Sequence, residues 1–166
     1  MPATWNDLTA IVNQIVDDSV ALKDKYTDAK NAHLSYCAIF CQSPDEFSQL
    51  KECVSENGKL VDDTATGPVY LVNPVISTKA GDCQLVKIRR PDENRPERGD
   101  TDFALESYED FKQRYLGQEN FKLIEREEFE MIELMDSHFN VRVYFSNPPV
   151  EEHSGIREAL ADKSYN

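Results

Sequence analysis

Apolar side chains in the first 30 residues recur at the spacing of an amphipathic helix. Their period is near 3.6 residues, and they are Trp5, Leu8, Ile11, Val12, Ile15, Val16 and Leu22. Thr4 precedes them and Asp7 follows three positions later, which is the pattern of a capping box at a helix N-terminus. We therefore predict an N-terminal amphipathic helix within residues 1–32 that packs on the rest of the domain. A partner helix or a second copy is the alternative occupant of its apolar face.

After residue 32 the chain changes to short apolar segments typical of strands, and it repeats itself. Segment 43–49 matches segment 107–113 at an offset of 64, with Ser, two acidic residues, Phe and Gln in register. Ser43 and Ser107 are predicted helix N-caps, because a serine hydroxyl can accept a hydrogen bond from a free backbone N–H of the first turn. Segment 59–63 matches 122–126 at an offset of 63, so the repeat continues beyond each helix.

Predicted strands flank both helices in the same order. One strand precedes each helix and three follow it, over 34–41, 59–63, 68–75 and 83–90 in the first repeat and over 101–106, 121–126, 129–135 and 141–145 in the second. Charged residues, proline and glycine fill the linker 90–100. These patterns predict an α+β fold with two paired βαβββ modules, at about 33–90 and 101–147, in one curved mixed sheet. The tail 148–166 is expected to hold a short helix.

The chain is acidic, with 31 Asp and Glu against 18 Lys and Arg and a net charge of −13. Such a charge repels nucleic-acid phosphates and anionic lipids, so we expect neither a nucleic acid nor a membrane as partner. The N-terminus lacks the basic and apolar segments of a signal peptide, and no apolar run approaches the ~20 residues that cross a bilayer. We expect a cytoplasmic monomer or homodimer.

Common catalytic motifs are missing from the sequence. It contains no HExxH, P-loop, GxGxxG or GxSxG, and its three histidines are scattered at His33, His138 and His153. The four cysteines form no CxxC pair and lie in apolar segments, so we expect them to be buried and reduced; they are Cys37, Cys41, Cys53 and Cys83.

The paired βαβββ pattern over roughly 33–147 resembles the vicinal oxygen chelate superfamily, which contains glyoxalases and ring-cleaving dioxygenases. Within it, segments 37–41, 87–91 and 101–105 resemble the bacterial YecM-like proteins, which also carry an N-terminal helical segment. In metal-dependent members, the first and last strands of each module supply ligands, typically His and Glu. The matching positions here are Tyr36, Arg89, Asp102 and Tyr144. Only Asp102 is a suitable cation ligand, and the charge of Arg89 repels a cation, so the resemblance implies a lost metal site and no cofactor.

Strand alternation predicts what replaces the metal site, because residues two apart share a face. One face of the predicted sheet collects polar and aromatic side chains, while the other is apolar. The predicted ligand-binding residues are Tyr36, Phe40, Lys87, Arg89, Asp102, Glu133, Arg142 and Tyr144. Here the cations would hold a carboxylate or phosphate, and the aromatic rings would stack on the ligand. Glu133 could act as a general acid or base or form a simple salt bridge; we assign no catalytic residue.

These residues favour a metal-free protein that binds a small anionic metabolite on a glyoxalase-like scaffold. A solvated sheet surface with salt bridges would explain the same residues without a ligand. Two further hypotheses are an isomerase or lyase of the superfamily, and an acidic protein-interaction module that uses the N-terminal helix.

Overall fold

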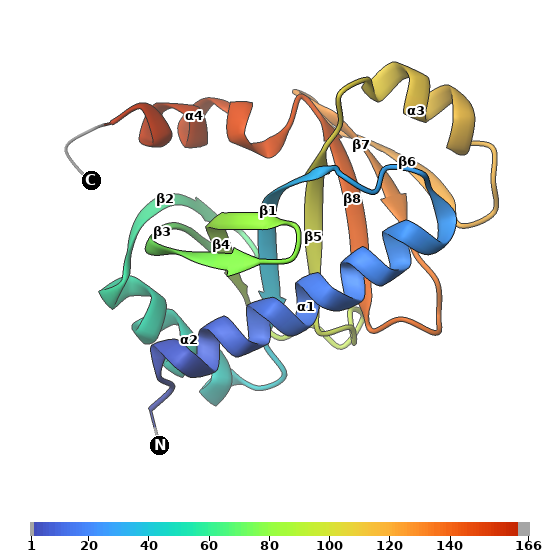
Figure 1. Cartoon of the computed structure of the whole chain (residues 1–166). Coiled ribbons are helices and arrows are strands. Elements are labelled where there is room, and N and C mark those ends of the chain that lie inside the picture. Colours follow the sequence, from blue (N-terminus) through green and yellow to red (C-terminus); the bar gives the residue numbers. More distant parts are fainter. Residues whose placement is uncertain (1, 163–166) are drawn as a thin grey trace.

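The computed structural model describes residues 2–162 and has an α+β fold, as predicted. Helix α1 (Trp5–Tyr26) lies across an eight-stranded mixed sheet (Figure 1). The first module contains β1 (His33–Phe40), α2 (Pro44–Glu56), β2 (Gly58–Thr64), β3 (Gly67–Thr78) and β4 (Gly81–Arg89). The second contains β5 (Gly99–Ala104), α3 (Tyr108–Tyr115), β6 (Phe121–Glu125), β7 (Glu130–Leu134) and β8 (Val141–Asn147). The 3₁₀ helix η1 (Val150–Glu152) and α4 (Ser154–Ala161) follow.

The sheet order is β2-β3-β4-β1-β5-β8-β7-β6, so the two modules have the same internal arrangement about the centre. Strands β1 and β5 pair in an antiparallel manner and join the modules. Each of them also pairs in parallel with the last strand of its own module, β4 or β8. The two predicted βαβββ modules are therefore confirmed.

Helix α1 begins with the predicted capping box. The Asp7 N–H donates to Thr4 Oγ1 at 3.1 Å, and the Thr4 N–H donates to Asp7 Oδ2 at 2.8 Å. The helix ends at Tyr26, within the predicted residues 1–32, because Thr27 turns to extended backbone while its N–H and hydroxyl both donate to the Lys23 carbonyl. The predicted apolar stripe packs on the sheet, with the fully buried side chains Leu8, Val12, Ile15, Val16 and Leu22.

The two repeated helices begin where predicted, but their caps differ. Ser43 Oγ accepts a hydrogen bond from the Glu46 N–H at 3.1 Å, whereas Ser107 makes no side-chain cap bond. Helix α3 is instead joined to β7 through Glu130, which accepts hydrogen bonds of 2.8 Å from the Tyr108 hydroxyl and from Lys112 Nζ. The repeat thus locates the helix start without fixing its capping chemistry.

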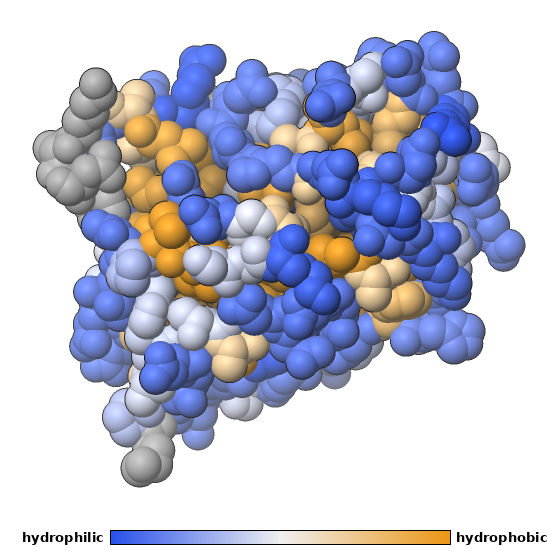
Figure 2. All heavy atoms as spheres, in the orientation of Figure 1, coloured by the Kyte–Doolittle hydropathy of each residue, from blue (hydrophilic) through white to orange (hydrophobic). Residues whose placement is uncertain are grey.

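The main core lies between helices α1, α2 and α3 and the apolar sheet face. It includes all four cysteines, which are buried and free, as predicted. A smaller cluster on the other sheet face joins Val150 and Ile156 to Leu71 and Leu85, so the C-terminal elements cover one end of that face. The surface in Figure 2 is mostly hydrophilic, with hydrophobic side chains visible between polar ones. Within residues 2–162, no helix is long and apolar enough to cross a membrane.

Strand β5 corrects the predicted linker, because it begins at Gly99 and takes in Asp100. Gly99 lies where β1, β5 and α1 come closest. A Cβ on Gly99 would lie 2.3 Å from the Ala38 carbonyl oxygen and 2.6 Å from Ile15 Cδ1. Any side chain at this position therefore has to push the centre of the sheet and α1 apart.

We expect Gly99→Ala to lower the free energy of unfolding by about 2–3 kcal/mol, because the backbone carbonyl of Ala38 cannot move aside at low cost. Gly117→Ala is the matched control, since no heavy atom lies within 4 Å of the added methyl group. Urea unfolding of both variants measures the difference. Equal midpoints would contradict the packing argument.

Candidate binding site

The sheet face opposite α1, here called the polar face, aligns charged side chains across its centre. The strand register places Ala38 beside Lys87 on one side and beside Asp100 on the other, and Asp100 pairs with Arg142. Two residues further along β4, the Arg89 guanidinium lies 5.3 Å from the centre of the Phe40 ring. Ala38 thus leaves only a methyl group between two oppositely charged residues.

A second row on the polar face connects Tyr36, Asp102, Tyr144 and Glu133 in register. The Tyr144 hydroxyl donates to Glu133 Oε2 at 2.8 Å. Ser146 donates its N–H to Asp102 Oδ1 at 3.1 Å and its hydroxyl to Oδ2. The two rows and the Arg89–Phe40 pair bring all eight predicted residues to one face.

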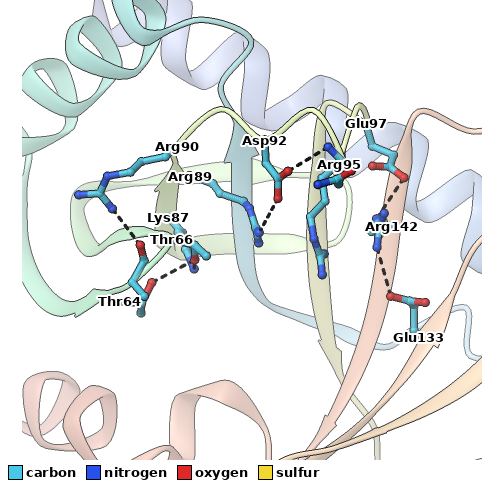
Figure 3. Close-up of polar contacts among 12 residues, drawn as sticks. Thr64, Thr66, Lys87, Arg89, Arg90, Asp92, Arg95, Glu97, Glu133 and Arg142 are labelled. Atoms are coloured by element: carbon cyan, nitrogen blue, oxygen red, sulfur yellow. Dashed lines mark hydrogen bonds and ion pairs between the residues drawn. The ribbon is translucent and has the colours of Figure 1, made fainter.

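The linker residues 90–98 run along one end of the central strands, and two of their carboxylates pair with cations of this face (Figure 3). Arg142 Nε lies 3.1 Å from Glu97 Oε1, and its Nη1 lies 3.6 Å from Glu133 Oε2. Arg89 Nη2 lies 3.5 Å from Asp92 Oδ2. Arg142 is therefore held between two carboxylates and is not the free anion contact that the sequence predicts.

Two cations of the polar face have no ion pair with any residue between 2 and 162. The Arg95 guanidinium reaches only the Tyr144 hydroxyl, at 3.4 Å. Lys87 Nζ donates to the Thr66 hydroxyl, and burial lowers the pKa of this lysine. Figure 3 shows Lys87, Arg89 and Arg95 on the same face, with the Arg95 side chain extending from the linker across the strands.

Asp100 is the main residue that sequence reasoning misses here. Its side chain is 8 % exposed, and neither carboxylate oxygen makes a hydrogen bond with a residue in the described range. Burial raises the pKa of Asp100 to about 6, although four surrounding cations act in the opposite direction; they are Lys87, Arg89, Arg95 and Arg142. Asp100 thus remains largely ionised at neutral pH while lacking a donor.

Asp102 is buried next to Asp100 but has a different environment. Burial raises its pKa to about 8, and the hydrogen bonds from Ser146 only partly oppose this shift. The same desolvation raises the pKa of Tyr144 to about 12 and that of Tyr36 well above 10. Asp102 is consequently mostly protonated at neutral pH and belongs to the hydrogen-bonded interior of the sheet.

Several buried polar atoms under the linker lack hydrogen-bond partners within residues 2–162. They are Arg89 Nε, Glu97 Oε2 and Asp100 Oδ1; Arg142 Nε also makes no hydrogen bond but lies in the ion pair with Glu97. Native proteins pair most buried polar atoms, so a group of unpaired ones on one face indicates a place for water or a ligand. A cleft of about 840 Å³ adjoins this region and includes Glu97 and Glu133 in its lining.

The residues at the expected metal positions do not fit a divalent cation. Ser146 occupies both oxygens of Asp102, and Arg89 adds a fixed positive charge to the same face. Among residues 2–162, no three His, Cys, Asp or Glu side chains are grouped so that they could hold a metal ion. The chemistry of the polar face is that of cations, phenols and carboxyl groups.

The comparisons with known proteins support the fold and nothing more specific. No protein-family model matches the chain, and no curated protein matches it significantly. A solved structure, the structural-genomics protein EC4020, is similar, with a TM-score of 0.67 at 10% sequence identity. The alignment covers 88% of this chain and 92% of that chain.

We expect Asp102→Asn to change how stability depends on pH. Because folding raises the pKa of Asp102 from 3.8 to about 8, the folded state binds its proton more tightly. The free energy of unfolding therefore falls as pH rises from about 4 to about 8, by at most about 1.4 kcal/mol per pH unit for one proton. Asparagine can accept from the Ser146 N–H through Oδ1 and donate to the Ser146 hydroxyl through Nδ2, but it cannot ionise. The variant should therefore become progressively more stable than the wild type over this range.

Urea unfolding between pH 4 and 8 measures this difference, with the exposed Asp63→Asn as the control. Parallel stability curves for the wild type and Asp102→Asn would show that Asp102 has no raised pKa in the folded protein.

Proposed function

We propose that this protein binds a small organic anion on the polar face of its sheet. The observation that carries the proposal is the pair of cations Lys87 and Arg95. Neither has a carboxylate within ion-pair distance in the described range, and both lie on the polar face (Figure 3). Arg89 adds a third cation whose Nε lacks a partner. Asp92 pairs with Arg89, and Asp100 acts on all three cations only through space, so these two carboxylates do not balance three partly buried cations. An anionic ligand would therefore stabilise the group.

The proposed contacts differ in part from the predicted set. Lys87, Arg89 and Arg95 would hold the carboxylate or phosphate, and Phe40 would border the ligand beneath the Arg89 guanidinium. Arg142 would instead position Glu97 and Glu133 at the border of the site. Membership of the vicinal oxygen chelate superfamily and its YecM-like branch, a cytoplasmic location and the oligomeric state stay predictions.

A titration with simple anions tests the proposal. Isothermal calorimetry or NMR with acetate, succinate and inorganic phosphate should give saturable binding to the wild type. Arg95→Met should weaken that binding by about 10- to 100-fold, because a charge-assisted hydrogen bond contributes about 1.5–3 kcal/mol. Met keeps most of the apolar stem and removes only the donors.

Arg114→Met is the matched control, because Arg114 is exposed on α3 and pairs with Asp28 away from the polar face. It should bind the anions as the wild type does. The proposed function would be overturned if none of the three anions bound the wild type at tens of millimolar. It would also be overturned if Arg95→Met bound them as tightly as the wild type does.

A further inference from the structure

Asp100 combines burial, negative charge and the lack of any donor within the described range, and an anion site alone does not explain it. Four cations surround its carboxylate closely enough to lower its pKa, yet none of them donates a hydrogen bond to it. A carboxylate next to an anion site also repels the ligand that the cations attract. The site therefore contains an acceptor that needs a donor from elsewhere.

We infer that the ligand of the polar face is a hydroxylated organic anion, whose hydroxyl group donates to Asp100 while its anionic group contacts Lys87, Arg89 and Arg95. This inference rests on the proposed function and narrows its substrate class to hydroxycarboxylates and hydroxylated phosphates such as sugar acids or sugar phosphates. One ligand would then satisfy both the unpaired cations and the unpaired carboxylate.

The surroundings of Asp100 favour a hydroxyl over the other common donors. An ammonium group or a metal ion would enter a region that already holds four cations, and the repulsion would cancel much of the gain. A hydroxyl donates one hydrogen bond without adding charge. A hydrogen bond to a charged acceptor is also stronger than one to a neutral acceptor. The preference for a hydroxylated anion should therefore be measurable as a difference in affinity.

The sheet geometry allows one small molecule to contact both Lys87 and Asp100. Ala38 lies between Lys87 and Asp100 in register, so two strand spacings, or about 10 Å, separate their Cα atoms. Both side chains rise from the same face, and Ala38 places no polar group between them. A compact ligand can therefore reach the lysine and the carboxylate together.

The test uses matched pairs of anions that differ only in hydroxyl groups: succinate and malate, propionate and lactate, hexanoate and gluconate. NMR titration of the full chain measures the dissociation constants. In at least one pair, the hydroxylated member should bind the wild type about 10-fold or more tightly, as expected for one charge-assisted hydrogen bond.

Two substitutions of Asp100 separate its acceptor role from its charge. Asp100→Asn keeps a carbonyl oxygen and should retain a preference for the hydroxylated member. Asp100→Leu has a similar volume but no acceptor, so the two members of the pair should bind equally, and the unsubstituted anion should bind at least as well as it does to the wild type. Circular dichroism checks folding, and Asp100→Ala replaces the leucine variant if that variant does not fold.

The outcomes distinguish this inference from the proposed function. Binding of both members with equal affinity to the wild type, lost in Arg95→Met, would overturn the hydroxyl contact and leave the anion site standing; water would then satisfy Asp100. A preference that persists in the leucine or alanine variant would also overturn the inference. Failure of every probe to bind the wild type would overturn both.

Discussion

The pairing of β1 with β5 is the constraint on which the rest of the structure depends. It joins the two modules, and it is close enough that only glycine fits at position 99. Because side chains alternate along a strand, this one register sends Ile39 and Phe103 into the core and presents Ala38 and Asp100 on the polar face. A slip of one residue would exchange the buried set and the site, so the core specifies the site geometry.

The two buried aspartates of β5 illustrate two ways of keeping a carboxyl group inside a protein. Asp102 has hydrogen-bond donors from Ser146 on both oxygens, and its raised pKa keeps it mostly neutral. Asp100 has cations around it but no donor in the described range, and it keeps its charge at neutral pH. The first arrangement is complete within the fold, whereas the second leaves a buried carboxylate oxygen without a donor among residues 2–162.

The sequence predicts the modules well because local signals mark them. The helix starts at Ser43 and Ser107, the repeat offsets and the alternation in each strand are all short-range features. The sequence did not predict Asp100 and Arg95 as site residues, because the linker contains proline, glycine and many charges, and such residues usually form a solvated loop. In the fold, Gly99 lies close to Ala38 and Ile15. These residues are distant in the sequence, so the local pattern around Gly99 does not reveal the contact. The cover that Ile156 and Val150 provide over Leu71 and Leu85 is equally non-local.

An acidic net charge is compatible with a cationic site, because the net charge acts on large polyanions whereas the nearby cations act on a small ligand at short range. Exposed charges are screened beyond about 8–10 Å at physiological ionic strength, so the net charge of −13 repels large polyanions that meet much of the surface at once. A small anion that reaches the polar face is influenced mainly by the nearby Lys87, Arg89 and Arg95, where burial weakens screening. Under the proposed function, the same charge distribution would repel nucleic acids and still admit small anions. The likeness to EC4020 at 10% identity extends to the fold alone, so the proposed preference for small anions rests on the side chains of the polar face.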